Sequence, residues 1–544
     1  MNKLLGYRWM AAALAALALA TPAAIADTPS PAGYDGLVRL FEDWRAFERP
    51  PLRDGAPDYT AATFARRHAE LPAWQARLAA IDTAAWPVEA RVDHRLVAAE
   101  MNGFDFYVRV LKPWERDPAF YLTVWDEQSD TPAHEGPEHH AIVDVWKYQF
   151  PLDRDGEARL AAALAVIPPL NEQARLNLTG NAHDLWVTGA GTMRKQIDSL
   201  DVLAKRTEGS GRALKRAIAA ARSSTVAFVD WLDAEGPKKT GPSGIGRENY
   251  SWALQNVYQV PMTWEQEVSL LRRELARTHA SLKAEEERNR NLPPMQEIRT
   301  PEEFERRGDE AITRYLAFLR DRKLYPMRDN LEPALRAMRG SYVPIETRNF
   351  FAIATHYEPL TLYTHFYHWW DLARMRDEPH PSPVRRGPLL YNIWNSRAEG
   401  MATAMEELML NAGLFDDEPR AREVVWIMLA QRAARGLASL LAQDNQFNNA
   451  QAKAFQVEWT PRGWMRPDLD LLGFEQQIYL RKPGYGTSYV TGKNLLDELI
   501  RVRSHQLGPD FSLYRFFDEV NGAGMIPVSL IDWQLTGHEP GVWK

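Results

Sequence analysis

Two histidines three positions apart are the residues of this sequence best suited to chemistry. They are His365 and His368, in the stretch HYEPLTLYTHFYHWWDLARM that begins at His356. On an α-helix this spacing puts both imidazoles on one face. Glu399, on the next predicted helix, adds a carboxylate. Two imidazoles and a carboxylate can hold a catalytic zinc ion, which keeps its fourth position for water. The expected metal ligands are therefore His365, His368 and Glu399.

The same residues have a simpler interpretation, and the sequence leaves both open. Histidines in a helix rich in tryptophan and tyrosine are more often packed and hydrogen-bonded in a core than bound to metal. Glu399 and Glu406 could equally be buried partners of arginines. Zinc is the only cofactor that the pattern suggests.

Composition restricts the chemistry and the partners. The 544 residues include no cysteine, which excludes thiol nucleophiles and thiolate metal sites. If the first 26 residues are removed, Lys3 and Arg8 are lost, and 63 basic residues (65 − 2) face 72 acidic ones. This negative balance of about nine argues against nucleic acid or an anionic membrane as partner. We expect a small molecule or a peptide as substrate.

The first 26 residues have the pattern of a secretory signal. Lys3 and Arg8 form a basic start, an apolar run extends from Trp9 to Ala20, and Ala24-Ile25-Ala26 is a small-residue cleavage site. We expect cleavage after Ala26 and a periplasmic or secreted protein. No second apolar run approaches the length of a membrane span, so we expect no stable insertion after cleavage.

Helical periodicity dominates the rest of the chain and predicts an all-α fold. Thr263 with Gln266 marks the start of a helix that runs toward Arg288, and Thr300-Pro301-Glu302-Glu303 marks another start. Apolar residues between 420 and 441 recur at the helical period. Alternating patterns are few, and a small strand element is expected only between Tyr342 and Ile353.

One stretch rich in glycine, proline and lysine, Gly236 to Gly244, is a candidate boundary. It predicts an N-terminal helical region over 27–240 and a C-terminal region over 241–544 that carries the candidate site. No repeat or low-complexity linker divides the chain, so the two regions are expected to form one continuous fold.

Several motifs resemble those of the bacterial domain-of-unknown-function 885 family, whose members look like helical, zinc-dependent peptidases of the zincin type. Glu399-Gly400-Met401-Ala402 with Glu407 is similar to the family's E-G-W-A…E helix. The stretch from Tyr479 to Gly492 is similar to its R-Y…P-G-Q-x-x-x-Y-x-x-G segment, and Asn521 to Pro527 resembles its closing N-G-x-x-P. The similarity is strongest in the C-terminal half.

This resemblance implies a zincin-like architecture and roles for two residues. Glu399 takes the place of the downstream metal ligand, and Tyr489 takes that of the tyrosine that polarises a substrate carbonyl. The implied activity is that of an exported hydrolase of metallopeptidase fold, acting on a small peptide, an amide or a related compound.

The sequence departs from the family at the zinc helix, L-T-L-H-E-x-x-P-G-H-H. In that register Tyr363 and Thr364 stand where the histidine ligand and the glutamate base belong. Tyrosine is a poor zinc ligand near neutral pH, and threonine cannot act as the base. His365 and His368 could form a shifted site with Glu399.

The remaining expected site residues follow from this shifted arrangement. Glu358 or Glu406 would take the base role, and together with Tyr489 they are the predicted catalytic residues. Predicted substrate-binding residues are Tyr363, Tyr367, Trp369 and Arg481. The string His134-Glu135-Gly-Pro-Glu138-His139-His140 echoes the missing motif, but its flanking proline and glycine favour a solvated loop.

Two other functions stay open. Loss of the His-Glu pair is typical of a pseudo-peptidase that keeps its fold as a binding protein. Alternatively, the same cleft could run a lyase or isomerase reaction without metal, using histidines, Tyr489 and carboxylates.

Overall fold

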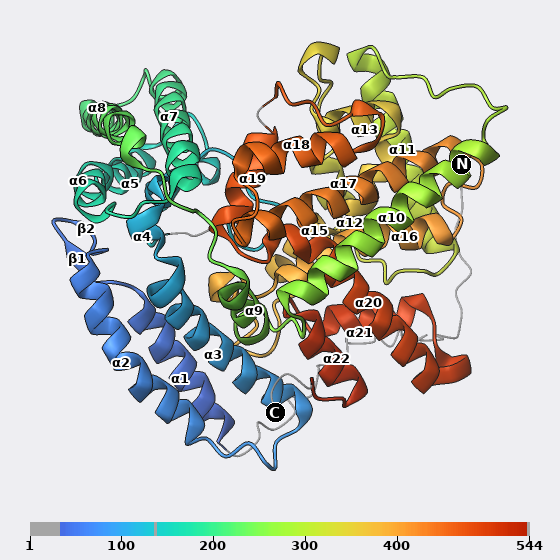
Figure 1. Ribbon diagram of the computed structural model, residues 1–544, viewed down its shortest axis with the longest axis horizontal. Coiled ribbons are helices and arrows are strands. Elements are labelled where there is room, and N and C mark those ends of the chain that lie inside the picture. Colours follow the sequence, from blue (N-terminus) through green and yellow to red (C-terminus); the bar gives the residue numbers. More distant parts are fainter. Residues whose placement is uncertain (1–32, 135–138, 470, 541–544) are drawn as a thin grey trace, which may run out of the picture.

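A computed structural model describes residues 33–134, 139–469 and 471–540 (Figure 1). Helices make up nearly all of the regular structure in these residues, which confirms the all-α prediction. The expected signal segment, residues 1–26, lies outside the described residues.

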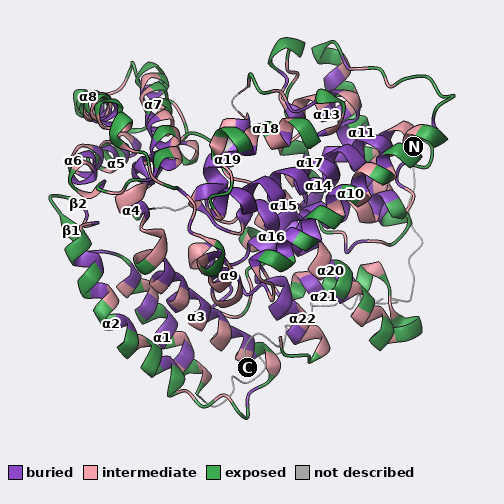
Figure 2. Cartoon of the chain, in the orientation of Figure 1, coloured by how far each residue is buried: buried purple, intermediate pink, exposed green. Residues whose placement is uncertain are grey.

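Four long helices form the centre of the molecule: α10 (Trp264–Arg288), α16 (Asn395–Asn411), α17 (Pro419–Gln443) and α20 (Tyr485–Leu507). Helix α17 packs against α10 and α20, and α16 packs against α20. Every residue of α17 from Glu423 to Gln443 is buried, and Figure 2 shows this helix mainly in the colour of buried residues. Helix α17 is therefore surrounded by other elements on all sides, and its buried charged residues are paired, as Arg432 with Glu406 and Arg435 with Glu475.

Helix α17 corrects one expectation. Among the described helices it alone is long and apolar enough to cross a membrane, although no such run was expected after the signal. Its most apolar window is entirely buried by the rest of the protein, so α17 is a core helix here.

The predicted helix starts at Thr263 and Thr300 are confirmed. At the start of α10, the Thr263 hydroxyl accepts from the Gln266 amide, and the Gln266 side chain accepts from the Thr263 amide. Helix α11 (Pro301–Asp321) begins with Thr300 accepting from the Glu303 amide and with proline in its first turn. Both caps satisfy amides that have no partner inside the helix.

Two glycines let α16 and α20 approach closely. A Cβ atom added to Gly400 would lie 2.5 Å from the Gly492 Cα atom, and one added to Gly492 would lie 2.1 Å from the Ser396 carbonyl oxygen. No larger residue fits at either position without moving a helix. Both glycines belong to the family-like motifs. Close packing of α16 against α20 therefore explains why those motifs contain glycine at these two positions.

The main core also takes helices from both ends of the chain. Its outer helices are α1 (Tyr34–Glu48), α2 (Ala61–Ala79), α3 (Val88–Phe106), α9 (Arg247–Asn256), α11, α12 (Leu331–Ala337), α13 (Phe350–Tyr357), α14 (Pro359–His365), α15 (Tyr367–Asp377), α18 (Asn449–Trp459), α19 (Leu471–Arg481), α21 (Leu513–Gly522) and α22 (Val528–Thr536).

A second, smaller core is built from residues 56–232. Its helices are α4 (Pro113–Arg116), α5 (Arg154–Leu164), α6 (Ile167–Asn177), α7 (His183–Arg206) and α8 (Arg212–Glu235). The expected N-terminal region 27–240 is therefore not one packing unit, because α1 and α3 contribute to the main core instead.

Residues 236–244, which follow α8, are hydrogen-bonded to both parts of the protein that they connect. The Gly241 carbonyl accepts from the His183 amide at 3.0 Å, and the Gly244 amide donates to Asn445 Oδ1 at 2.8 Å. Residues 236–244 are thus held against both cores, and they join the two regions more rigidly than a flexible linker would.

The expected strand between Tyr342 and Ile353 is wrong. That segment is irregular up to a short 3₁₀ turn, Ile345–Thr347, and then enters α13. The described strands lie elsewhere: β1 (Leu52–Arg53) pairs antiparallel with β2 (Ala56–Pro57), and β3 (Val124–Trp125) pairs parallel with β4 (Val143–Asp144).

Candidate metal centre

His365 and His368 lie on two helices, where one was expected. His365 is the last residue of α14 and His368 the second residue of α15, with Phe366 at ψ 18° between them. The two rings still converge, with centroids 5.1 Å apart and planes at 77°. Both side chains are buried.

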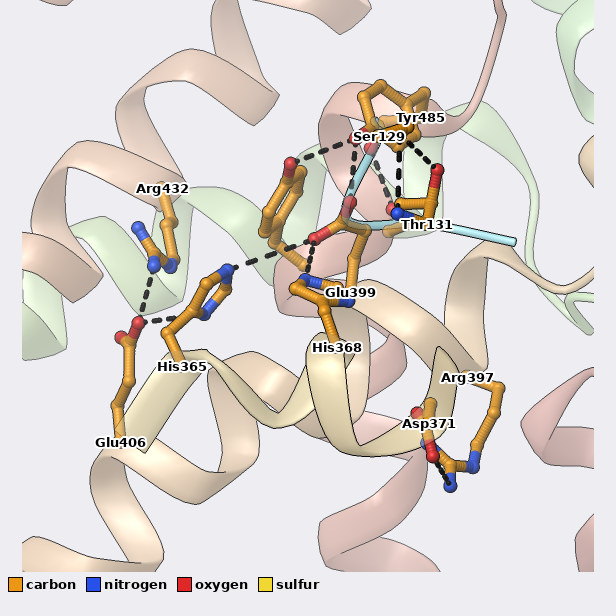
Figure 3. Close-up of polar contacts among 12 residues, drawn as sticks. Ser129, Thr131, His365, His368, Asp371, Arg397, Glu399, Glu406, Arg432 and Tyr485 are labelled. Carbon is orange, nitrogen blue, oxygen red and sulfur yellow. Dashed lines mark hydrogen bonds and ion pairs between the residues drawn. The ribbon is translucent and has the colours of Figure 1, made fainter. Parts of the chain in front are cut away.

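Glu399 of α16 completes the group. His368 Nε2 lies 3.1 Å from Glu399 Oε2, and His365 Nε2 lies 4.0 Å from the same oxygen. The other oxygen, Oε1, accepts from the Tyr485 hydroxyl at 2.6 Å. Figure 3 shows the three side chains directed toward one another. The structure therefore brings together the three residues predicted as ligands.

The surroundings of the two histidines shift their pKa values in opposite directions. Burial and the nearby Arg432 hold the pKa of His365 well below its usual value, so His365 is neutral. Burial alone would also lower the pKa of His368, but the Glu399 carboxylate raises it to about 9. The same imidazole, by charge and hydrogen bond, lowers the pKa of Glu399 despite its burial. Without a metal ion, His368 and Glu399 thus form a buried ion pair.

Glu406 lies next to His365 on the side of the ring opposite Glu399. Its Oε1 lies 2.9 Å from His365 Nδ1 and is also paired with Arg432 of α17. The contact uses Nδ1, so Nε2 is the nitrogen that faces Glu399. Carboxylates commonly orient metal-bound histidines in this way. Glu406 is therefore placed to position a ligand.

Two tyrosines of α20 cover the group. The Tyr489 ring lies parallel to the His365 ring at 6.2 Å, and its hydroxyl donates to the Tyr485 hydroxyl at 3.3 Å. The Arg435 guanidinium lies 3.8 Å from the centre of the Tyr489 ring. Tyr489 was predicted from the family-like motif, and Tyr485 was missed. Their spacing of four residues on one helix was the signal available.

Asp130 was also missed. Burial and the charge of Glu399 raise the pKa of Asp130, while the charge of His368 lowers it. Asp130 comes from the segment that follows β3, and its neighbours Ser129 and Thr131 appear beside Tyr485 in Figure 3. Nothing in the sequence near Asp130 links it to residues more than 230 positions away.

Other predicted residues lie away from the group. Glu358 begins α14, where it accepts from the Leu360 amide, and it pairs with Arg307 at 3.2 Å. Burial and the neighbouring Glu418 raise the pKa of Glu358 to about 7. The Tyr363 hydroxyl donates to the Arg339 carbonyl at 3.0 Å. Neither side chain is brought together with the histidines.

The remaining predicted substrate residues are likewise dispersed. Tyr367 donates to Asn521 Oδ1 at 2.5 Å, in a polar network next to α21. Arg481 pairs with Asp117 through two nitrogens, at 2.5 and 3.2 Å. Trp369 is partly exposed. An aromatic wall around the histidines therefore consists of Tyr485 and Tyr489 rather than of these residues.

The solvated-loop interpretation of the 134–140 string is wrong for His134 and His139, whereas His140 is exposed. His134 is buried against the Trp125 ring, and its Nε2 lies 2.8 Å from Asp144 Oδ1. His139 is buried as well, and burial lowers its pKa to about 3. Residues 135–138 lie outside the described residues.

The geometry fits a zinc ion. One nitrogen from each histidine and one oxygen of Glu399 all lie within 4.8 Å of one another. Tetrahedral ligands at about 2.0–2.1 Å from zinc would be roughly 3.3 Å apart, so small side-chain shifts suffice. The donor set is nitrogen and oxygen, which suits zinc. A cation would replace the proton that His368 and Glu399 share.

Fold and site together define a class: a helical protein with a buried two-histidine, one-carboxylate group at its centre. The sequence model of the family "Bacterial protein of unknown function (DUF885)" matches residues 45–340, which is more than half of the chain. The chain belongs to this family. The matched range ends before His365, whereas the resemblance was expected to be strongest in the C-terminal half.

Two solved structures share the fold. A protein of Shewanella oneidensis, described as a candidate lipoprotein of unknown function, has a TM-score of 0.68 at 16% identity. A candidate lipoprotein of Colwellia psychrerythraea has a TM-score of 0.62 at 13% identity. Each comparison covers 93% of this chain and 99% of the other. No curated protein matches the sequence significantly.

Proposed function

We propose that this protein is a metal-dependent hydrolase that acts on a small peptide, an amide or a related compound. The observation that carries the proposal is the convergence of His365, His368 and Glu399 within 4.8 Å, in a buried position. Buried ionisable groups with opposed pKa shifts are typical of functional sites.

Each residue around the three proposed metal ligands has a separate proposed role. A bound zinc ion would polarise a carbonyl group and lower the pKa of a water molecule. Tyr485 and Tyr489 present hydroxyl groups on the Glu399 side, where a carbonyl oxygen that gains negative charge could be stabilised. Glu406 is held by Arg432, which makes it a positioning residue. Asp130 is the proposed base, because its neighbours Ser129 and Thr131 lie beside Tyr485 and because the charges of His368 and Glu399 both affect its pKa.

Metal analysis of the mature chain tests the proposal. We expect about one zinc equivalent per chain, lost in His365→Ala and kept in His279→Ala, because His279 bonds the Trp459 carbonyl on the exposed side of α10. Asp130→Asn should keep the metal and lose turnover. Absence of bound zinc after incubation with excess metal would refute the site.

Hydrolysis itself is tested by product mass. Products of a panel of small peptides and amides should gain one water, and a chelator should stop their formation. A product of unchanged mass would point to the isomerase alternative, and products whose masses sum to that of the substrate without added water would point to the lyase. Full turnover by the His365→Ala and His368→Ala double variant would point to either of these metal-free reactions.

One observation favours a binding protein as the second candidate. Each predicted ligand already has a protein partner, and Thr364 occupies the place of the base. Thermal stabilisation by a ligand without any turnover, unchanged in the double histidine variant, would support this alternative.

We also propose that the chain is exported. The support is the basic, apolar and small-residue order of residues 1–26. Amino-terminal sequencing of protein from the periplasmic fraction should begin at Asp27. A protein recovered from the cytoplasm with an intact amino terminus would contradict it.

A further inference from the structure

A cavity of about 250 Å³ lies between the N-terminal helices and the turn that joins α19 to α20. Its walls come from segments distant in sequence, among them α1, the end of α3, residues 388–392 and residues 481–482. Mainly apolar cavities with a few placed polar groups are typical of small-molecule sites. Most of this wall is apolar, with side chains that include Phe64, Phe106, Leu111, Val257 and Leu389.

The basic side chains of the wall are already engaged with other groups of the protein. Arg45 lies 3.5 Å from Glu100, and Arg481 pairs with the buried Asp117. The Lys482 amino group lies over two aromatic rings, 5.0 and 4.6 Å from their centres. None of these three cations is therefore left to bind an anionic ligand.

The acidic side chain of the wall, Glu48, is engaged as well. It pairs with His140 Nε2 at 2.7 Å and accepts from the Tyr391 hydroxyl. Arg67 donates to the Phe47 carbonyl. Burial would raise the pKa of Glu48, but the hydrogen bond with His140 and the charge of Arg67 help to hold it below its usual value. A charged ligand would meet no unmatched charge here, and burying a charge without a partner is costly, so the wall favours an uncharged ligand.

Two tyrosine hydroxyls of the wall are left for a ligand. Tyr107 and Tyr258 both line the cavity, and neither hydroxyl has a hydrogen-bond partner within the described part of the chain. Tyr258 is only 7% exposed, and burial raises its pKa, so its hydroxyl stays protonated. A buried hydroxyl without a partner is unfavourable, and a ligand oxygen that accepts from it would remove this cost.

The backbone around the cavity departs from regular geometry at several points. Helix α3 continues into a π-helical turn, Tyr107–Leu111, whose first and last residues both line the cavity. Tyr391 and Asn392 of the wall have φ of 58° and 53°, and Gln259, next to Tyr258, has φ of 55°. Residues other than glycine rarely adopt this left-handed region. Such strain and π-helical turns are frequent at functional sites.

We propose that this cavity binds an uncharged compound of one ring and a short chain that carries a carbonyl oxygen. The apolar side chains cover the ring, and the Tyr258 hydroxyl, with Tyr107 as the second donor, binds the oxygen. The volume lies just below the usual range for ligand pockets, which limits the ligand to about this size. This binding does not depend on the metal centre, because none of the three proposed metal ligands lines the cavity.

Calorimetry with three probes of similar shape tests the binding. The mature full-length chain is titrated with 4-phenyl-2-butanone, 3-phenylpropanoate and 3-phenylpropylamine, which are neutral, anionic and cationic. The ketone should bind at least about tenfold tighter than either charged probe, because neither charge finds an unmatched partner in the wall. Equal or tighter binding of a charged probe, or no binding of the ketone, would overturn the proposal.

Tyrosine variants identify the donors. Tyr107→Phe with Tyr258→Phe should weaken ketone binding about fivefold to tenfold, because the hydrogen bond is lost while the rings stay in the wall. The hydrocarbon 2-methyl-4-phenyl-1-butene has the same shape but no acceptor, and it should bind the double variant and the unchanged protein alike. Tyr514→Phe, at an exposed position of α21, is the matched control and should change neither affinity. Unchanged ketone affinity in the double variant would refute recognition by these hydroxyls.

A filled cavity and a chelator locate the site. Leu111→Trp places a larger side chain in the wall and should weaken the ketone and the hydrocarbon alike. The ketone should bind equally well with a chelator and with excess zinc, whatever the metal content of the chain. Ketone binding that survives Leu111→Trp unchanged, or that requires zinc, would place the ligand elsewhere and overturn the inference.

Discussion

His365 is oriented by its neighbours on two other helices. Glu406 Oε1 lies 2.9 Å from Nδ1 and is paired with Arg432, and Nε2 is on the side of Glu399. Burial raises the pKa of Glu406 to about 7, against the effect of Arg432 and Arg435. Glu406 therefore occupies the Nδ1 side of His365, which leaves Nε2 on the side of Glu399.

This arrangement predicts the effect of Glu406→Gln. Without the carboxylate, His365 loses both its tautomer preference and its fixed ring, so zinc affinity should fall about 10–100-fold. Competition with a chelating dye measures the change. Glu407→Gln is the matched control: Glu407 pairs with Arg277 and Lys493, away from the ligands, and its loss should leave zinc affinity unchanged.

Glu267 predicts a pH effect on stability. It is fully buried, accepts from the Tyr250 and Thr491 hydroxyls, and burial raises its pKa to about 7. The unfolded chain releases this proton near pH 4.5 and the folded protein near pH 7. The contribution of Glu267 to stability is therefore complete below pH 4.5 and is lost as pH rises to 7, by about 3 kcal/mol.

Glu267→Gln removes that titration. Relative to the unchanged protein, the variant should gain unfolding free energy between pH 4.5 and 7 and gain no more above pH 7, as measured by urea unfolding. A difference that does not vary with pH would show that Glu267 ionises alike in both states.

At the residue scale the sequence identified the three side chains that converge, but not the residues that surround them. His365 and His368 could be recognised because their spacing is local. Tyr485 could not, since its contact with Glu399 joins positions 86 residues apart. Tyr363 was misplaced because a helical pattern does not say which neighbour each face meets.

At the scale of the elements, the break between the short helices α14 and α15 affects how the two histidines are presented. The turn at Phe366 ends one helix and begins the next, yet it leaves both histidines facing α16. The sequence predicted the long helices well, because capping residues such as Thr263 and Thr300 act locally. It did not predict this interruption, because no proline or glycine marks Phe366.

The close contact of α16 and α20 predicts a large effect of Gly492→Ala. The added methyl would meet the Ser396 carbonyl, so α20 must move and carry Tyr485 away from Glu399. We expect a loss of about 1–3 kcal/mol or more in unfolding free energy, measured by thermal or urea unfolding.

Gly191→Ala is the control for this helix substitution. Gly191 lies inside α7 with no atom near its missing Cβ. Alanine there should stabilise the protein by about 1 kcal/mol through helix propensity. Equal effects at both positions would contradict the packing argument.

For the molecule as a whole, the buried pair of Arg481 and Asp117 joins the two cores. Arg481 ends α19, which belongs with the main helices, and Asp117 precedes the 3₁₀ turn at Pro118–Tyr121 in the smaller core. Arg481 was predicted to bind substrate. Its buried pairing with Asp117 indicates a structural role for Arg481 instead.

Arg481→Met should cost about 3–5 kcal/mol in unfolding free energy, because Asp117 is left buried and charged. Adding Asp117→Asn should recover a large part of that loss, and a double-mutant cycle measures the coupling. Additive losses would mean that the two side chains do not interact.

Helix α17 has a consequence before folding is complete. Its length and apolar composition would let it lodge in a bilayer while an exported chain passes through. Near its midpoint stand Arg432 and Arg435, and an arginine at the centre of such a segment costs about 2.5–3.5 kcal/mol on insertion. If the chain is exported as proposed, the two cations that pair with Glu406 and Glu475 in the folded protein would also disfavour insertion of this helix into the bilayer.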